Sequence, residues 1–325
     1  MKTNDKLEPE GGLTLMQMMT RFSTEESARE YFENLLWPNG PVCPHCGNNN
    51  QERIYKLTAN TSSKIRKGLH KCADCNERFT VTMNTVMEDS HIPLNKWLIA
   101  FYMMCASKTQ ISALQLQRHL ELGSYRTAWF MCHRIRFTLK DAMPAEKLSG
   151  TVEADETYIG GRVRGRGRRY VGNKTAVVSL VERSGRVRST VMDKVNGQVL
   201  SRLLRKHVAE SSHLNTDESG VYNVAGKSFA SHERVNHGAE EYARTDGKGR
   251  RVTTNTVEGF FGNAKRSLDG THHHVTRKYL PLYMAEIDHK YNLRKVSDGE
   301  RTNVGIKLVG GKRLMLRPPL KIKTK

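Results

Sequence analysis

The chain has 325 residues, enough for two or three modest domains with a well-packed core, so its length excludes no class of folded protein. Its 53 Lys and Arg residues outnumber its 33 Asp and Glu residues, and the formal net charge of +20 favours a polyanionic partner such as nucleic acid. The N-terminus has acidic residues and glycines where a secretory signal needs a basic start, and the longest apolar run, residues 97–106, is far shorter than the roughly 20 residues that span a bilayer. We therefore expect a cytoplasmic protein without a membrane segment.

A zinc ribbon is expected over residues 41–88, after an N-terminal helical segment over residues 1–40. Each Cys-x-x-Cys pair can bend into a knuckle that presents two thiolates, and two knuckles supply the tetrahedral sulfur set that Zn²⁺ prefers. A redox motif would need only one pair, so two pairs predict a structural zinc ion. The four cysteines that form the pairs are Cys43, Cys46, Cys72 and Cys75.

The other cysteines and two nearby histidines are not needed for this site. His45 and His70 could substitute as ligands, but four thiolates make them unnecessary. Cys132 shares one helical stripe with Ile135, which indicates a small residue of the core, and Cys105 is interpreted in the same way.

Residues 89–141 are predicted to form a helix-turn-helix-like DNA-binding region. The helical spacing of apolar residues breaks at Leu122 and Gly123, and Ser124 is placed to cap a second helix. Any helical hairpin with a basic face would give the same pattern, so a purely structural hairpin remains the alternative. The second helix is expected to expose side chains suited to phosphates and base edges, namely Tyr125, Arg126, Thr127, His133, Arg134 and Arg136.

After a linker at residues 141–150 the pattern becomes strand-like. Three runs, 151–161, 174–182 and 186–195, are expected to be strands, followed by a helix over 197–209 and a short strand over 213–217. This order predicts a mixed α/β domain.

The segment 160–172 is rich in glycine and arginine but lacks the Gly-x-x-x-x-Gly-Lys-Ser/Thr pattern of a P-loop. It is interpreted as a basic loop that contacts the phosphate backbone of DNA. The arginines expected to make these contacts are Arg164, Arg166, Arg168 and Arg169.

Carboxylates stand out in this basic chain. Side chains alternate along a strand, so Glu153 and Asp155 share one face and Glu156 lies on the other. Asp217 ends the short strand 213–217, and Glu258 lies on the polar stripe of a predicted amphipathic helix. Two Asp and a Glu on two strands and a helix suit a two-metal phosphoryl-transfer site, because Mg²⁺ or Mn²⁺ ions prefer carboxylate oxygens.

Two structural explanations compete with metal binding at these acids. Glu153 and Glu156 could simply pair with arginines. The spacing of Asn255 and Glu258 also matches a capping box, in which Glu258 would reach back to the helix N-terminus.

Taken together, the motifs resemble those of bacterial insertion-sequence transposases of the DDE type. The resemblance rests on the paired cysteines and on the segments TAWFMCHRIR, EADETYIGG, NTDES, NTVEGFFGNAKRSLDGTHHHV and YMAEIDHKYNLR. It implies an RNase H-like catalytic domain over residues 150–295, C-terminal to the zinc ribbon, and a basic C-terminal tail over residues 296–325.

The resemblance also implies roles for individual residues. Asp155 and Asp217 correspond to the first two metal ligands, Glu258 to the third, and Lys265 to a DNA contact near the reacting phosphate. Some relatives carry Asn as the third ligand, which leaves Asn255 open as the alternative.

The implied activity is a transposase that hydrolyses a phosphodiester and then joins a DNA 3′-hydroxyl to target DNA, with Mg²⁺ or Mn²⁺ as cofactor. Its expected partners are double-stranded DNA, both terminal repeats and target, and further copies of the chain in a homodimeric or larger synaptic complex, within the bacterial nucleoid. Two alternatives are a domesticated DNA-binding regulator without activity and a nuclease that cuts without joining.

Overall fold

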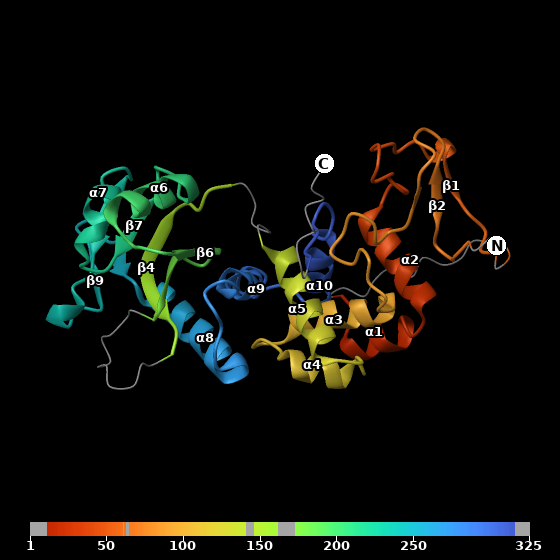
Figure 1. The fold of residues 1–325 in the computed structure, drawn as a ribbon. Coiled ribbons are helices and arrows are strands. Elements are labelled where there is room, and N and C mark those ends of the chain that lie inside the picture. Colours follow the sequence, from red (N-terminus) through yellow and green to blue (C-terminus); the bar gives the residue numbers. More distant parts are fainter. Residues whose placement is uncertain (1–11, 61, 63–64, 141–145, 162–172, 316–325) are drawn as a thin grey trace, which may run out of the picture. The chain divides into compact units, whose positions relative to one another are not determined.

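The computed structural model describes residues 12–60, 62, 65–140, 146–161 and 173–315 (Figure 1). The chain divides into two compact units, the first comprising Met1–Leu139 and Lys295–Lys325 and the second Lys140–Arg294. Each unit has its own hydrophobic core. Within the described residues, no helix has both the length and the apolar character that a membrane crossing requires.

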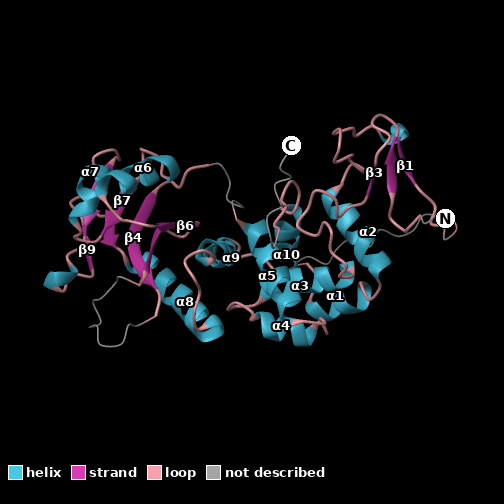
Figure 2. Cartoon of the chain, viewed as in Figure 1, coloured by secondary structure: helices cyan, strands magenta, loops and turns pink. Residues whose placement is uncertain are grey.

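The first unit is mainly helical (Figure 2). Its helices pack around aromatic and aliphatic side chains, including Phe32, Trp97, Leu98 and Phe101, which are at most 1% exposed. The helices are α1 (Leu15–Arg21), α2 (Glu25–Leu36), α3 (Leu94–Ala106), α4 (Ala113–His119), α5 (Tyr125–Leu139) and α10 (Asp298–Lys307).

A small antiparallel sheet in this unit carries the cysteine pairs. It consists of β1 (Ile54–Lys56), β2 (His70–Cys72) and β3 (Arg78–Phe79), in the order β1-β2-β3. Its own core is small, with Ile54 and Phe79 buried beside the cysteines and Trp37 packed against them. Cys105 and Cys132 are fully buried in the helical part, as predicted for structural cysteines.

The expectation of a basic tail over residues 296–325 is wrong for residues 296–315, the part that the structure describes. Ser297 and Glu300 form a capping box at the start of α10, and Ile306 and Val309 are fully buried in the core of the first unit. Amphipathic spacing with a proper N-cap therefore gives a packed helix, in which Asp298 and Glu300 balance Arg301 and Lys307.

The prediction of which side chains α5 exposes is partly wrong. Ser124 caps the helix as predicted, its hydroxyl accepting from the Thr127 backbone N–H (3.1 Å), and Tyr125 and Arg126 are exposed. His133 and Arg136, however, are each only 1% exposed, because α3, α4 and α10 all pack against this helix.

Arg134 is half-buried, and its guanidinium lies 4.7 Å from the centre of the Phe130 ring. The basic face of α5 is therefore limited to its first turn, and Arg136 is removed from the set of expected DNA contacts.

In the described part of the second unit, five strands form a mixed sheet in the order β6-β5-β4-β7-β8. The strand β5 (Thr175–Glu182) is antiparallel to both of its neighbours, β4 (Thr151–Ile159) and β6 (Val187–Met192), whereas β7 (His213–Thr216) and β8 (Ser231–Arg234) run parallel to β4. The predicted strands and the mixed α/β class are thus confirmed.

Helices cover both faces of this sheet. On one face, α6 (Gly197–His207) and α7 (Asn223–Gly226) pack over Ala154, Val178 and Leu180. On the other face, α8 (Asn255–His272) and α9 (Leu280–Asn292) pack over Val177, Val181 and Val187. A hairpin of β9 (Ala243–Thr245) and β10 (Arg251–Thr253) leads directly into α8.

Candidate functional site

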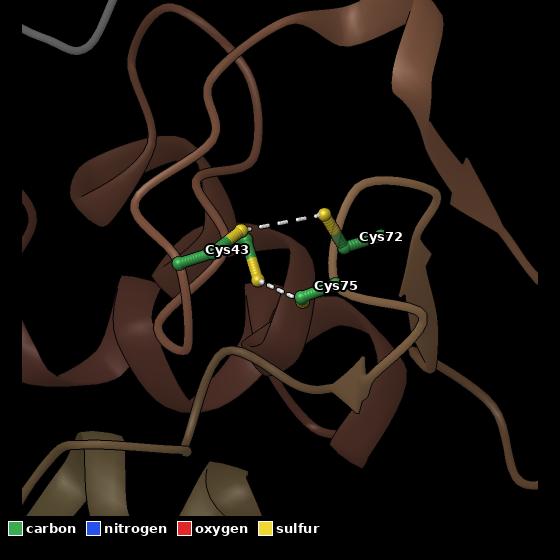
Figure 3. Close-up of side chains that lie close together, drawn as sticks. Cys43, Cys72 and Cys75 are labelled. Carbon is green, nitrogen blue, oxygen red and sulfur yellow. Dashed lines mark hydrogen bonds between the residues drawn. The ribbon is translucent and has the colours of Figure 1, made fainter.

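The four ribbon cysteines converge on one point, and Figure 3 shows Cys43, Cys72 and Cys75 of this group. Their sulfur atoms all lie within 4.8 Å of one another, with 3.6 Å between Cys43 and Cys75 and 3.6 Å between Cys46 and Cys72. Four sulfurs at the corners of a tetrahedron with Zn–S bonds of about 2.3 Å would be about 3.8 Å apart. The observed spacing therefore fits a tetrahedral zinc ion.

Hydrogen bonds within the ribbon also favour the thiolate form of Cys72. The backbone N–H of Cys75 and the side-chain amide of Asn48 donate to the Cys72 sulfur and lower the pKa of this thiol to about 6. At Cys75 the backbone N–H of Glu77 also donates, but burial and the neighbouring sulfurs raise the pKa to about 12. Four deprotonated sulfurs this close together would repel one another, and a dication bound among them would offset that repulsion.

In the second unit, Asp155 and Asp217 lie on neighbouring parallel strands. Asp155 is in the middle of β4, and Asp217 directly follows Thr216, the last residue of β7. Glu153 pairs with Asn215, so continuing this register by two residues places Asp155 opposite Asp217. The chain thus presents two carboxylates at adjacent positions where β7 ends.

The third acid, Glu258, comes from the first turn of α8. Val257, Phe261, Ala264 and Leu268 are buried against the sheet, which confirms the predicted apolar stripe. The polar stripe, consisting of Asn255, Glu258, Gly262 and Lys265, is exposed.

The charges of these three acids act on one another. Burial, together with the smaller effects of the Asp217, Glu156 and Glu258 carboxylates, raises the pKa of Asp155 to about 7, although the backbone N–H of Glu156 donates to this carboxylate and lowers its pKa. Burial likewise raises the pKa of Asp217, with Glu258 contributing and His237 opposing. A divalent cation bound beside Asp155 and Asp217 would favour their ionised forms, and carboxylate oxygens are the donors that such ions prefer.

The carboxylate oxygens are less tightly gathered than the sulfurs. Among the residues that the structure describes, only the cysteines form a group of three or more ligand atoms within 4.8 Å of one another.

The raised pKa of Asp155 has a consequence for stability. Because the folded state binds this proton more tightly than the unfolded chain, the contribution of Asp155 to the stability of the second unit without Mg²⁺ or Mn²⁺ should be largest below about pH 4 and should be lost as the pH rises through about 7. At pH 8 the ionised Asp155 should lower the free energy of unfolding by about 4 kcal/mol at most. Asp155→Asn should therefore stabilise this unit at pH 8.

Amide hydrogen exchange of β4 and β5, with the ribbon zinc left in place, measures this effect. Tryptophan fluorescence would not, because all three tryptophans, at positions 37, 97 and 129, belong to the first unit. Slower exchange in the variant at pH 8, and a smaller difference at pH 5, are expected. Equal or faster exchange at pH 8 would contradict the electrostatic argument.

Glu258 is held by side chains and not by the backbone bond of a capping box. The hydroxyl of Thr254, the N-cap of α8, donates to Glu258 Oε1 (2.6 Å), and His237 Nε2 lies 3.1 Å from the same oxygen. His237 also lies 3.1 Å from the Thr254 hydroxyl, and its backbone N–H donates to Glu218. Sequence reasoning missed His237, because the residues between it and α8 gave no pattern that brings them together.

The remaining acids of β4 have clear partners. Glu153 is fully buried and forms an ion pair with Arg183 (2.8 Å), as the arginine-pairing interpretation predicted. Glu156, on the opposite face, accepts a hydrogen bond from the buried Tyr222 hydroxyl (2.6 Å) in place of the expected arginine. The candidate DNA-contacting arginines of segment 160–172, Arg164, Arg166, Arg168 and Arg169, lie outside the described residues.

Comparison with known proteins adds independent information. Residues 147–292 match the ISXO2-like transposase domain, and residues 23–78 match the transposase zinc-ribbon domain. A protein of Halobacterium salinarum, named as an uncharacterized protein in transposable element ISH50, is 28% identical over 292 residues, covering 83% of this chain and 91% of the relative. The resemblance inferred from the sequence motifs is therefore confirmed.

Among solved structures, a chain from the cryo-EM structure of the simian T-cell lymphotropic virus intasome in complex with PP2A regulatory subunit B56 gamma aligns with 70% of this chain and 76% of its own. The sequence identity is 13% and the TM-score is 0.28, so this likeness supports no argument about fold or function.

Proposed function

Because the chain carries an ISXO2-like transposase domain behind a transposase zinc ribbon, we propose that it catalyses divalent-metal-dependent cleavage of insertion-sequence ends and their transfer to target DNA. The observation that carries this proposal is that two strands and a helix contribute Asp155, Asp217 and Glu258, with the register placing Asp155 opposite Asp217 where β7 ends. A protein that only bound DNA would gain nothing from unneutralised carboxylates beside phosphates.

Asp155, Asp217 and Glu258 would hold the metal ions, with Asp155 and Asp217 side by side at the end of β7. Two bound Mg²⁺ or Mn²⁺ ions would activate the attacking oxygen and stabilise the leaving oxygen of an in-line displacement. Thr254 and His237 would fix the Glu258 carboxylate by bonding to its Oε1. Asn255, on the same exposed stripe, is the alternative third ligand.

Lys265 would contact the DNA backbone close to the reacting phosphate. It follows Glu258 by seven residues, which is about two helical turns or 10 Å along the same exposed face of α8. Further contacts to terminal repeats and target DNA would come from the first turn of α5, including Arg126, with Arg134 at the partly buried edge of that face. Two copies of the chain would bridge two DNA ends.

Incubation of the purified protein with labelled ends of its own flanking DNA and Mg²⁺ tests the proposal directly. Nicked products followed by strand-transferred products are expected. Nicking without joining would instead support a nuclease, and binding without either product would support a DNA-binding regulator.

The salt dependence of DNA binding gives a separate prediction. If the protein neutralises six or more phosphates, its affinity should fall about 10³-fold or more between 50 and 200 mM salt. Fluorescence anisotropy can measure the slope of log affinity against log salt concentration. This slope should become less steep by up to about four when glutamine replaces Arg164, Arg166, Arg168 and Arg169. An unchanged slope would exclude these arginines as phosphate contacts.

A further inference from the structure

Glu153 is a fully buried carboxylate that bonds to backbone groups beside two of the proposed metal ligands. It precedes Asp155 by two residues on the same face of β4. Its Oε2 accepts from the backbone N–H of Thr256 (2.7 Å) and of Val257 (3.1 Å), and Val257 directly precedes Glu258. One carboxylate therefore joins the strand that carries one ligand to the helical turn that carries another.

The other oxygen of Glu153 is equally well held. Its Oε1 accepts from the Thr256 hydroxyl (2.9 Å) and from two nitrogens of the Arg183 guanidinium, Nη2 at 2.8 Å and Nε at 3.2 Å. Arg183 also donates to the Arg251 carbonyl (2.8 Å), on the strand that leads into α8. Charge-assisted bonds of this kind are short and directional, so the carboxylate has little freedom to move.

The bonds to α8 fall on groups that need an external partner. Backbone N–H groups in the first turn of a helix have no partner within the helix, and the helix dipole favours a negative charge beside them. Apolar packing of α8 on the sheet is not directional, so it opposes a small slide or rotation of the helix less strictly than these hydrogen bonds do. The Glu153 bonds do not allow such a shift.

We propose that Glu153 is a positioning residue that sets the separation of Asp155 and Glu258, so that both reach the same divalent ions. The inference rests on the proposed function, since it concerns the metal site of that reaction. Metal sites require their ligands within about 0.5 Å of the productive geometry, and Asp155 and Glu258 are 103 residues apart in the chain. A bond from β4 to the first turn of α8 meets this requirement.

Glu153→Gln removes the charge, keeps the size, and turns an amide N–H toward groups that themselves donate. Binding of Mn²⁺ to the full chain, measured by calorimetry with the Asp155→Asn variant as the blank for other sites, should weaken about tenfold, the lower end of the range for groups that orient metal ligands. The Mg²⁺ concentration for half-maximal DNA cleavage should rise in parallel.

Val181→Ala is the matched control. Val181 pairs with Glu153 across β4 and β5 and is fully buried under α8, so its truncation loosens the same packing but leaves the hydrogen bonds from Glu153 to the first turn of α8 in place. A merely structural Glu153 would predict the same metal affinity in both variants once each is folded. Tighter Mn²⁺ binding in Val181→Ala than in Glu153→Gln supports the positioning role, and equal binding overturns it.

Thr256→Val provides the test if Glu153→Gln does not fold, because it removes only the hydroxyl that donates to Glu153 Oε1. A rise of about threefold in the Mn²⁺ dissociation constant is expected, the size of effect that the loss of one hydrogen bond has, and an unchanged value overturns the inference. Failure of the wild-type protein to bind Mn²⁺ or cut DNA would refute the proposed function itself, which is a different result from wild-type behaviour in the variants.

Discussion

Glu258→Gln should fold and bind DNA normally but should cleave it at least 10²- to 10³-fold more slowly, the loss seen when one preorganised electrostatic group is removed from an active site. Glutamine keeps the size of the side chain and can still accept from the Thr254 hydroxyl, so the start of α8 should be preserved. It lacks the charge that would help to hold a divalent ion. Asp155→Asn and Asp217→Asn should have the same effect, measured as initial rates of cleavage of labelled element ends.

Asn255→Ala distinguishes the two candidates for the third ligand. Asn255 is exposed at the first position of α8, and its removal should leave the metal dependence of cleavage unchanged if Glu258 is the ligand. Normal cleavage by Glu258→Gln, together with an altered metal requirement in Asn255→Ala, would assign the role to Asn255 instead.

Features that depend on short stretches of sequence were predictable. A Cys-x-x-Cys pair contains its own knuckle, and the alternation around Asp155 and the apolar spacing around Phe261 each specify which side of one element is buried. For this reason the ribbon, β4 and the exposed stripe of α8 were predicted correctly. Each prediction required only the local geometry of a strand, a helix or a turn.

Features that depend on contacts between distant segments were not predictable in the same way. The polar pattern of α5 predicts an exposed Arg136, but this residue is only 1% exposed in a helix that three other helices contact. Glu153 was expected to pair with an arginine, which it does, yet its bonds to α8 follow only from the packing of that helix over β4. His237 lies beside Glu258 because of the path between β8 and β9, which no sequence period describes.

The ribbon gives the second large expected effect, because its own apolar core is too small to fold it. Ile54 and Phe79, with Trp37 packed alongside, are the main apolar side chains. The part of the ribbon between Cys43 and Phe79 is shorter than the roughly 40 residues below which a fold usually needs a metal or disulfides to be stable. Binding of structural zinc supplies about 10 kcal/mol or more at neutral pH, and this free energy becomes folding free energy. Loss of one ligand should therefore unfold the ribbon.

Cys72→Ser should reduce the zinc content from about one ion per chain to nearly none, and amide exchange of β2 and β3 should accelerate to the rate of an unfolded segment. The second unit should keep its wild-type exchange, because its hydrophobic cores contain no ribbon residue. Cys132→Ala is the matched control, since Cys132 lies in the core of the helical part and should retain the zinc. Full zinc content in Cys72→Ser would show that three sulfurs suffice, and zinc loss in both variants would mean that the metal responds to the stability of the whole first unit and not to its ligands.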